Sequence, residues 1–204
     1  MKRMRFAVLV SGSGTNLQAL LDAEARGELD PGEVVVVVSN RPEAAALGKA
    51  ARAGKPAIPL DHRPFPSREA FEDALREVLA NHQVDAVILA GFMRVLTPRF
   101  LAAYPDRVLN IHPSLLPAFP GIDSQRQAFE YGVKVTGCTV HFVDASVDGG
   151  AVILQRAVPV EPDDDVELLR ARILAEEHIL LPRAAQLLAA GRLERRGRRV
   201  FVLP

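Results

Sequence analysis

Cysteine is nearly absent from this chain: Cys138 is the only one among 204 residues. An intramolecular disulfide is therefore excluded, and the first residues carry no apolar leader segment, so we expect a cytoplasmic protein. Long apolar runs are also missing, since none is longer than residues 34–38 and a membrane helix needs roughly 20. The sequence therefore predicts a chain that does not span a membrane.

The chain has no excess of charge of either sign, because 25 basic residues balance 25 acidic ones. No overall field attracts nucleic acid or an anionic membrane, and small molecules are the expected partners. The arginines of residues 192–199 form a local basic cluster that we expect to lie on a solvated hairpin. With 49% hydrophobic residues the chain can bury a full core, which predicts a single domain over residues 1–204.

Short apolar runs alternate with helical segments through the first half of the chain. Strands are predicted at 6–10, 34–38, 84–90 and 108–112 with a short edge strand at 56–60, and helices at 17–25, 42–53, 68–81 and 98–103. Ser67 is the expected N-cap of the third helix. Such alternation is typical of a parallel sheet with crossover helices.

The pattern changes after residue 121. A short helix at 125–131 is followed by strands at 135–143 and 151–160, a long helix at 166–190 and a terminal hairpin at 192–203 that turns at Gly197. The connection between these two strands is too short for a crossover helix, so the strands are expected to be antiparallel. The predicted fold is α/β and Rossmann-like: a mostly parallel, twisted sheet with helices on both faces and an antiparallel C-terminal element.

A glycine-rich loop, Ser11-Gly-Ser-Gly-Thr-Asn16, follows the first strand and opens a helix. Free N–H groups at a helix N-terminus favour an anion. The third glycine of a dinucleotide fingerprint is replaced by Leu17, and no acidic residue follows the second strand. The loop therefore favours a monophosphate over NAD or ATP, and a simple tight turn remains the alternative.

Two polar side chains stand at the end of the 108–112 strand. Asn110 and His112 project from the same face because strand side chains alternate, and Pro113 ends the strand. Together they can donate two hydrogen bonds to one oxygen at an edge where α/β proteins bind ligands. Taken singly, His112 also fits a core histidine, and Asp148 before Gly149 fits an ordinary turn.

The remaining reactive residues favour structural roles. His178 has no histidine partner one helical turn away, so the sequence predicts no zinc site and no metal cofactor. Cys138 is expected to be a small buried strand residue. His141 is expected to lie on one sheet face with a single hydrogen bond.

Five ordered motifs resemble the folate-dependent glycinamide ribonucleotide formyltransferases. They are Ser11-Gly-x-Gly-Thr-Asn16, Leu89-Ala-Gly-Phe-Met-Arg94, Asn110-Ile-His-Pro-Ser-Leu-Leu-Pro117, Thr139-Val-His-Phe-Val143 and Asp148-Gly-Gly150. The resemblance covers nearly the whole chain. It implies formyl transfer from 10-formyltetrahydrofolate to the glycinamide amine of 5'-phosphoribosylglycinamide in purine biosynthesis, by a monomer or homodimer.

The resemblance also implies a set of site residues. The catalytic positions are Asn110, His112 and Asp148; the phosphate lies on Gly14, Thr15 and Asn16; the glycinamide lies near Glu177; and the folate contacts Arg68, Met93, Arg94, Val95, Leu96, Asn110 and Asp144. Residues 1–105 would form the phosphate-binding half and residues 106–204 the folate-binding and catalytic half.

The chemistry of formyl transfer suits these residue types. When an amine attacks the formyl carbon, the carbonyl oxygen gains negative charge that needs hydrogen-bond donors. Asn110 can supply an amide N–H, and His112 can supply an imidazolium N–H if a carboxylate keeps the ring protonated. Asp148 is assigned that role, which requires it to lie close to the ring.

The chain departs from the expected family pattern at two places. Asp123 and Gln125 stand where histidines are expected in several relatives, so no proton-transfer role is assigned there, and Thr15 replaces a usual serine. Methionyl-tRNA formyltransferase and formyltetrahydrofolate hydrolase share the signature strand, but they are expected to carry a further C-terminal or N-terminal domain. A non-catalytic nucleotide-binding module would explain only the glycine loop.

Overall fold

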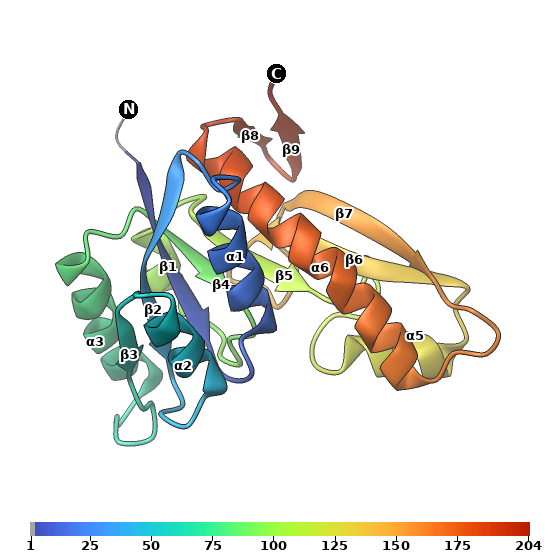
Figure 1. The fold of residues 1–204 in the computed structure, drawn as a ribbon, viewed down its shortest axis with the longest axis horizontal. Coiled ribbons are helices and arrows are strands. Elements are labelled where there is room, and N and C mark those ends of the chain that lie inside the picture. Colours follow the sequence, from blue (N-terminus) through green and yellow to red (C-terminus); the bar gives the residue numbers. More distant parts are fainter. Residues whose placement is uncertain (1–2) are drawn as a thin grey trace.

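The computed structural model describes residues 3–204; Met1 and Lys2, on which part of the expectation about a leader segment falls, lie outside the described residues. These residues build a sheet with the strand order β3-β2-β1-β4-β5-β6-β7-β9-β8 (Figure 1). The strands are β1 Met4–Val10, β2 Gly32–Ser39, β3 Ala57–Pro59, β4 Ala86–Leu89, β5 Val108–His112, β6 Val135–Phe142, β7 Val152–Pro159, β8 Leu193–Arg196 and β9 Arg199–Val202.

The first five strands run parallel, whereas β6 pairs antiparallel with both β5 and β7. The terminal hairpin β8–β9 joins the sheet where Arg199 of β9 pairs with Val152 of β7. The strands that follow β1 are added on both of its sides: β2 and β3 lie on one side, and β4 and β5 lie on the other. The predicted fold class, including the antiparallel C-terminal element, is confirmed.

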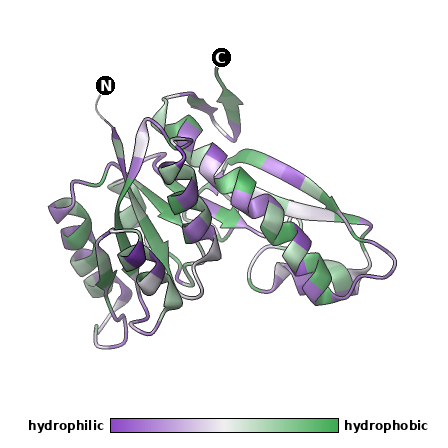
Figure 2. Cartoon of the chain, viewed as in Figure 1, coloured by the Kyte–Doolittle hydropathy of each residue, from purple (hydrophilic) through white to green (hydrophobic). Residues whose placement is uncertain are grey.

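Helices cover both faces of the sheet. They are α1 Thr15–Ala25, α2 Ala45–Arg52, α3 Arg68–Asn81, α4 Pro98–Ala102, α5 Ser124–Tyr131 and α6 Val166–Ala189. Alternate residues of β1 enter different cores: Val8 packs in the cluster that includes residues of α1, α2 and α6, and Leu9 packs in the cluster that includes residues of α3 and α4. Figure 2 shows β1 and β4 largely apolar, as burial on both faces requires.

Local hydrogen bonds explain where the helices begin. Ser67 accepts the Ala70 N–H at 3.1 Å and caps α3, as predicted. The helix predicted from residue 42 begins instead at Ala45, because Ala44 donates its N–H to the Arg41 carbonyl in a preceding turn. Within residues 3–204 no helix combines the length and apolar character of a bilayer span.

Candidate active site

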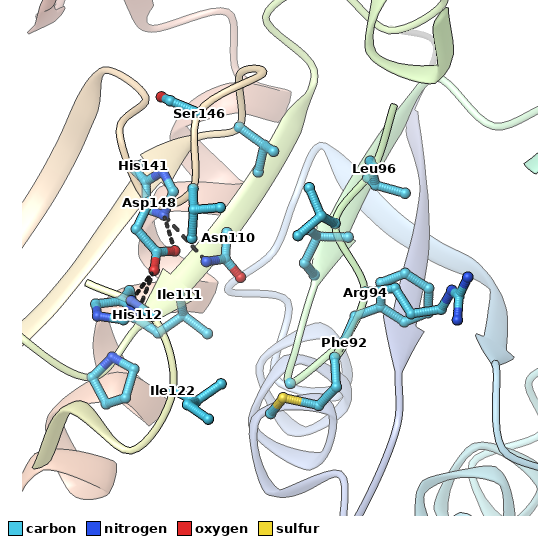
Figure 3. A pocket seen from close by; sticks show the side chains of 18 of the residues that line it. Phe92, Arg94, Leu96, Asn110, Ile111, His112, Ile122, His141, Ser146 and Asp148 are labelled. Atoms are coloured by element: carbon cyan, nitrogen blue, oxygen red, sulfur yellow. Dashed lines mark hydrogen bonds and ion pairs between the residues drawn. The ribbon is translucent and has the colours of Figure 1, made fainter. Parts of the chain in front are cut away.

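A pocket of about 410 Å³ opens beyond the carboxyl ends of β4 and β5. One wall is formed by residues 91–96 after β4, the base by Asn110 and His112 of β5, and the other wall by residues from the 144–148 loop. Figure 3 shows Phe92, Arg94 and Leu96 across the pocket from the two histidines and Asp148. The predicted catalytic strand end therefore lies in a cavity formed by both halves of the chain.

His112 is held at both of its ring nitrogens. Its side chain is 5% exposed, with Nδ1 3.4 Å from Asp148 Oδ2 and Nε2 2.9 Å from the Phe119 carbonyl oxygen. A carbonyl oxygen only accepts, so Nε2 is the donor to Phe119, and Nδ1 faces the Asp148 carboxylate. Both ring nitrogens of His112 therefore face hydrogen-bond acceptors.

Asp148 is fixed by backbone geometry as well as by His112. Its Oδ2 accepts the Gly121 N–H at 2.7 Å, and its own φ of 52° is a left-handed conformation that few non-glycine residues adopt. Nearby, a Cβ on Gly150 would lie 1.6 Å from the Phe142 carbonyl oxygen. This close approach holds the end of the 144–150 loop against β6 and delivers Asp148 to β5.

His141 belongs to the same cluster, although the sequence favoured a structural role with a single hydrogen bond. Its Nδ1 donates to the Phe142 carbonyl at 2.9 Å, which leaves Nε2 to accept the Asn110 amide at 3.1 Å. Nε2 also lies 3.8 Å from Asp148 Oδ1. Burial lowers the pKa of His141, so the neutral ring is favoured and orients Asn110.

The antiparallel register explains why this role was missed. Asn110 of β5 pairs directly with His141 of β6, and the two residues are separated by a helix and two loops in sequence. The presence of His141 in the Thr139–Val143 motif was the available signal. Only the register shows that it faces the catalytic strand.

Most of the predicted folate residues line the pocket. Met93, Arg94, Val95, Leu96 and Asp144 all do, and the side chains of Met93 and Val95 are 67% and 47% exposed. Exposed apolar side chains inside a cleft are what a flat aromatic ligand needs for burial.

Arg68 and Arg94 differ in their surroundings. The Arg94 guanidinium lies 5.1 Å from the centre of the Phe71 ring, in a cation–π contact beside the pocket. Arg68 is exposed and is not among the residues that line the pocket, because it occupies the first position of α3. Arg68 is therefore the predicted folate residue that does not line this pocket.

The glycine loop has the geometry of an anion site. Gly14 is the N-cap of α1 with φ 70°, and a Cβ there would lie 2.6 Å from Ala46 Cβ, so only glycine fits. No side chain caps the helix, which leaves its first N–H groups available to an anion. Thr15 lines a second pocket together with Lys49 and His178.

Asn16 and Glu177 are in contact although they are 161 positions apart in the sequence. Asn16 donates from Nδ2 to Glu177 Oε2 at 2.7 Å, and its Oδ1 has no hydrogen-bond partner among the described residues. Burial raises the pKa of Glu177, although the hydrogen bond from Asn16 opposes that effect. The structure thus joins the predicted phosphate loop to the predicted glycinamide residue.

Asp123 and Gln125 both line the pocket from the loop before α5 and its first turn. Asp123 accepts hydrogen bonds from Arg170 at 2.5 Å and Arg126 at 3.1 Å. These bonds, the Arg170 one foremost, hold the pKa of Asp123 below its usual value. An ionised carboxylate in two ion pairs is a poor proton donor, which fits the absence of a proton-transfer role here.

Other reactive groups lie outside this chemistry. Cys138 is fully buried, and burial raises the pKa of its thiol to about 12, so it is inert as a nucleophile. Among residues 3–204, no group of three or more histidine, cysteine or acidic side chains is placed to hold a metal ion.

Comparisons with known proteins show the family of the chain. A family model described as formyl transferase matches residues 4–185. The chain belongs to the formyl transferase family. The family resemblance predicted from the five motifs is therefore confirmed.

This formyl transferase has relatives of two lengths. It is 44% identical over 191 residues to phosphoribosylglycinamide formyltransferase of Escherichia coli strain K12, covering 94% of this chain and 90% of that protein. It is 49% identical over 196 residues to the trifunctional purine biosynthetic protein adenosine-3 of Drosophila pseudoobscura pseudoobscura. The match covers 95% of this chain but only 14% of that protein.

A solved structure shares the whole fold. Glycinamide ribonucleotide transformylase 1 from Symbiobacterium toebii superposes with a TM-score of 0.97 at 57% sequence identity. The alignment covers 100% of this formyl transferase and 95% of that chain.

Proposed function

We propose that this formyl transferase moves a formyl group from 10-formyltetrahydrofolate to the glycinamide amine of 5'-phosphoribosylglycinamide, giving formylglycinamide ribonucleotide and tetrahydrofolate in de novo purine biosynthesis. The relatives of similar length carry the name of this activity. The observation that carries the proposal is the convergence of Asn110, His112 and Asp148 at the base of one pocket.

Each of these residues has a defined part in the proposed reaction. Asn110 donates an N–H to the carbonyl oxygen as the amine adds to the formyl carbon and negative charge develops there, and His112 donates its Nε2–H to that oxygen in place of the bond to the Phe119 carbonyl. The Asp148 carboxylate lies 3.4 Å from Nδ1 of His112 and orients the ring. His141 holds the Asn110 amide, which carries two hydrogens and so can still donate one to substrate.

The pocket suits the formyl-folate that the family uses as co-substrate. The exposed apolar side chains of Met93 and Val95 can cover a flat heterocycle, and the Asp144 carboxylate can accept its N–H groups. We assign folate binding to residues 93–96 with Asn110 and Asp144. The exposed position of Arg68 gives its assignment no support from this pocket.

We assign the nucleotide substrate to the glycine-rich loop of residues 11–16, which leads into α1. Gly14, Thr15 and Asn16 at the N-terminus of α1 would hold the phosphate, and Glu177 would hold the glycinamide. The 2.7 Å bond between Asn16 and Glu177 supports this pairing because it joins the two assignments. Residues 1–105 and 106–204 then act as the phosphate-binding half and the folate-binding, catalytic half.

The proposed partners are these small molecules alone, with no metal and no nucleic acid, and the proposed location is the cytoplasm. The balanced charge of the chain supports the absence of a nucleic-acid partner. A monomer or a homodimer remains the predicted state.

One assay separates the candidate functions. The protein is incubated with 10-formyltetrahydrofolate, with and without 5'-phosphoribosylglycinamide, and tetrahydrofolate and formylated nucleotide are measured. Formylated product that requires both substrates supports the proposal. Tetrahydrofolate and formate released without the amine would instead indicate a hydrolase, and no reaction would indicate a binding module.

A further inference from the structure

Ser11 connects three loops at the carboxyl edge of the sheet. It follows β1, while Asn40 follows β2 and residues 91–93 follow β4, and β1 lies between those two strands. Ser11 donates its backbone N–H to the Gly91 carbonyl at 3.1 Å. Its hydroxyl donates to Asn40 Oδ1 at 2.5 Å and accepts the Met93 N–H at 2.9 Å.

The orientation of this hydroxyl is fixed. A hydroxyl has one proton, and the amide oxygen of Asn40 takes it, so a lone pair is left for Met93. Ser11 and Asn40 are 5% and 2% exposed. The backbone carbonyl oxygen of Asn40 also accepts a hydrogen bond from His62 Nδ1 at 3.0 Å. Water does not compete easily for bonds at this depth, so the link is strong.

The two segments that Ser11 joins are those assigned to the two substrates. Ser11 begins the loop that ends in Gly14, Thr15 and Asn16, and Met93 begins the pocket-lining segment 93–96. The Met93 side chain is 67% exposed, so its packing contributes little to the position of its backbone. The hydrogen bond to Ser11 therefore constrains the backbone where this segment starts, next to the buried Phe92.

We propose that Ser11 is a positioning residue for formyl transfer, which sets the phosphate-binding loop and the folate-binding segment at the separation that the amine and the formyl carbon need to meet. This inference rests on the proposed function. Reacting atoms must approach within about 3.5 Å, and a misplacement of about 1 Å can cost on the order of a hundredfold in rate. The role belongs to the Ser11 hydroxyl, which acts through the Met93 backbone and the Asn40 side chain.

The test compares Ser11→Ala with Ser39→Ala. Ser39 is also fully buried, but its hydroxyl bonds only with the backbone of Arg41, so it controls for loss of a buried hydroxyl. In Ser11→Ala we expect amide hydrogen exchange at Met93 to accelerate and kcat to fall by about tenfold or more. The dissociation constant of each substrate measured alone should change by less than about threefold, because each half of the site remains intact.

A second variant guards against a fold defect. Ser11→Cys nearly keeps the volume but supplies a weakly hydrogen-bonding thiol, so exchange and kcat should shift in the same direction by a smaller amount. Two results would overturn the role of Ser11, provided that the parent is active. One is unchanged amide hydrogen exchange at Met93 in both variants, and the other is a variant that loses substrate affinity but keeps its kcat. A parent protein that transfers no formyl group in the same assay overturns the proposed function instead.

Discussion

At the scale of single residues, the site depends on which atoms face His112. One carboxylate oxygen of Asp148 faces Nδ1 and one backbone carbonyl faces Nε2, so the ring is surrounded by acceptors. The sequence predicted the pairing of Asp148 with His112 from the family resemblance. It could not predict the Phe119 carbonyl or the part of His141, because both depend on how distant segments pack.

His112→Ala tests the proposed donor. Removal of one oxyanion donor costs about a hundredfold to a thousandfold in turnover, so kcat for tetrahydrofolate release should fall at least that far. His82→Ala is the control, because the His82 ring at the end of α3 bonds to the Val78 carbonyl, and the His82 backbone carbonyl that accepts from Arg5 is kept. A His112→Ala enzyme within tenfold of the parent would contradict the assignment.

Asp148→Asn separates charge from shape. Asparagine keeps the volume and one oxygen, but it places no negative charge beside the His112 ring. We expect a slow enzyme whose KM values are close to those of the parent, measured by steady-state kinetics for both substrates. A parent-like kcat with a large rise in KM would mean that Asp148 positions substrate.

At the scale of elements, α4 is held in place by a buried carboxylate of α3. Glu72 is 3% exposed and accepts the Thr97 N–H at 2.8 Å and the Thr97 hydroxyl, directly after the 93–96 segment. Periodicity predicted both helices, and the cap residue of α3, because these are local features. It gave no indication of the Glu72 contact, which joins positions 25 apart.

Glu72→Leu should therefore destabilise the fold. The buried N–H and hydroxyl of Thr97 would lose their acceptor, so the free energy of unfolding in urea should fall by roughly 1–3 kcal/mol. Asp73→Ala is the neighbouring control, since Asp73 is half-exposed and its ion pair with Arg99 is a surface pair that contributes about 0–1 kcal/mol. Equal losses of unfolding free energy in the two variants would show that the Glu72–Thr97 contact stabilises the fold no more than a surface ion pair.

At the scale of the whole molecule, the first and last long helices meet at the proposed nucleotide site. Glu177 of α6 is 5% exposed and accepts from Asn16 of α1, and burial raises the pKa of its carboxyl. An acid whose pKa is raised on folding costs stability once the pH rises above its unfolded value. A buried carboxylate kept at this cost is typical of a functional site.

Glu177→Gln should then stabilise the protein while weakening substrate binding. Glutamine can still accept from Asn16, and removal of the buried charge should raise the free energy of unfolding at pH 7.5 by about 1 kcal/mol. The gain should shrink as the pH falls toward 4, where the parent carboxyl takes up its proton. A loss of stability at pH 7.5, or an unchanged KM for the nucleotide, would contradict this expectation.

The sequence by itself determined the strands, most helix ends, the glycine-rich loop of residues 11–16 and the strand end with Asn110 and His112. Each of these is a local feature, written in the spacing of neighbouring side chains and in Gly and Pro positions. Only the tertiary structure decided that His141 lies opposite Asn110, that Arg68 stays outside the pocket, and that Asn16 reaches Glu177. Strand register and long-range contacts depend on how packed elements fit together, and no local pattern specifies that fit.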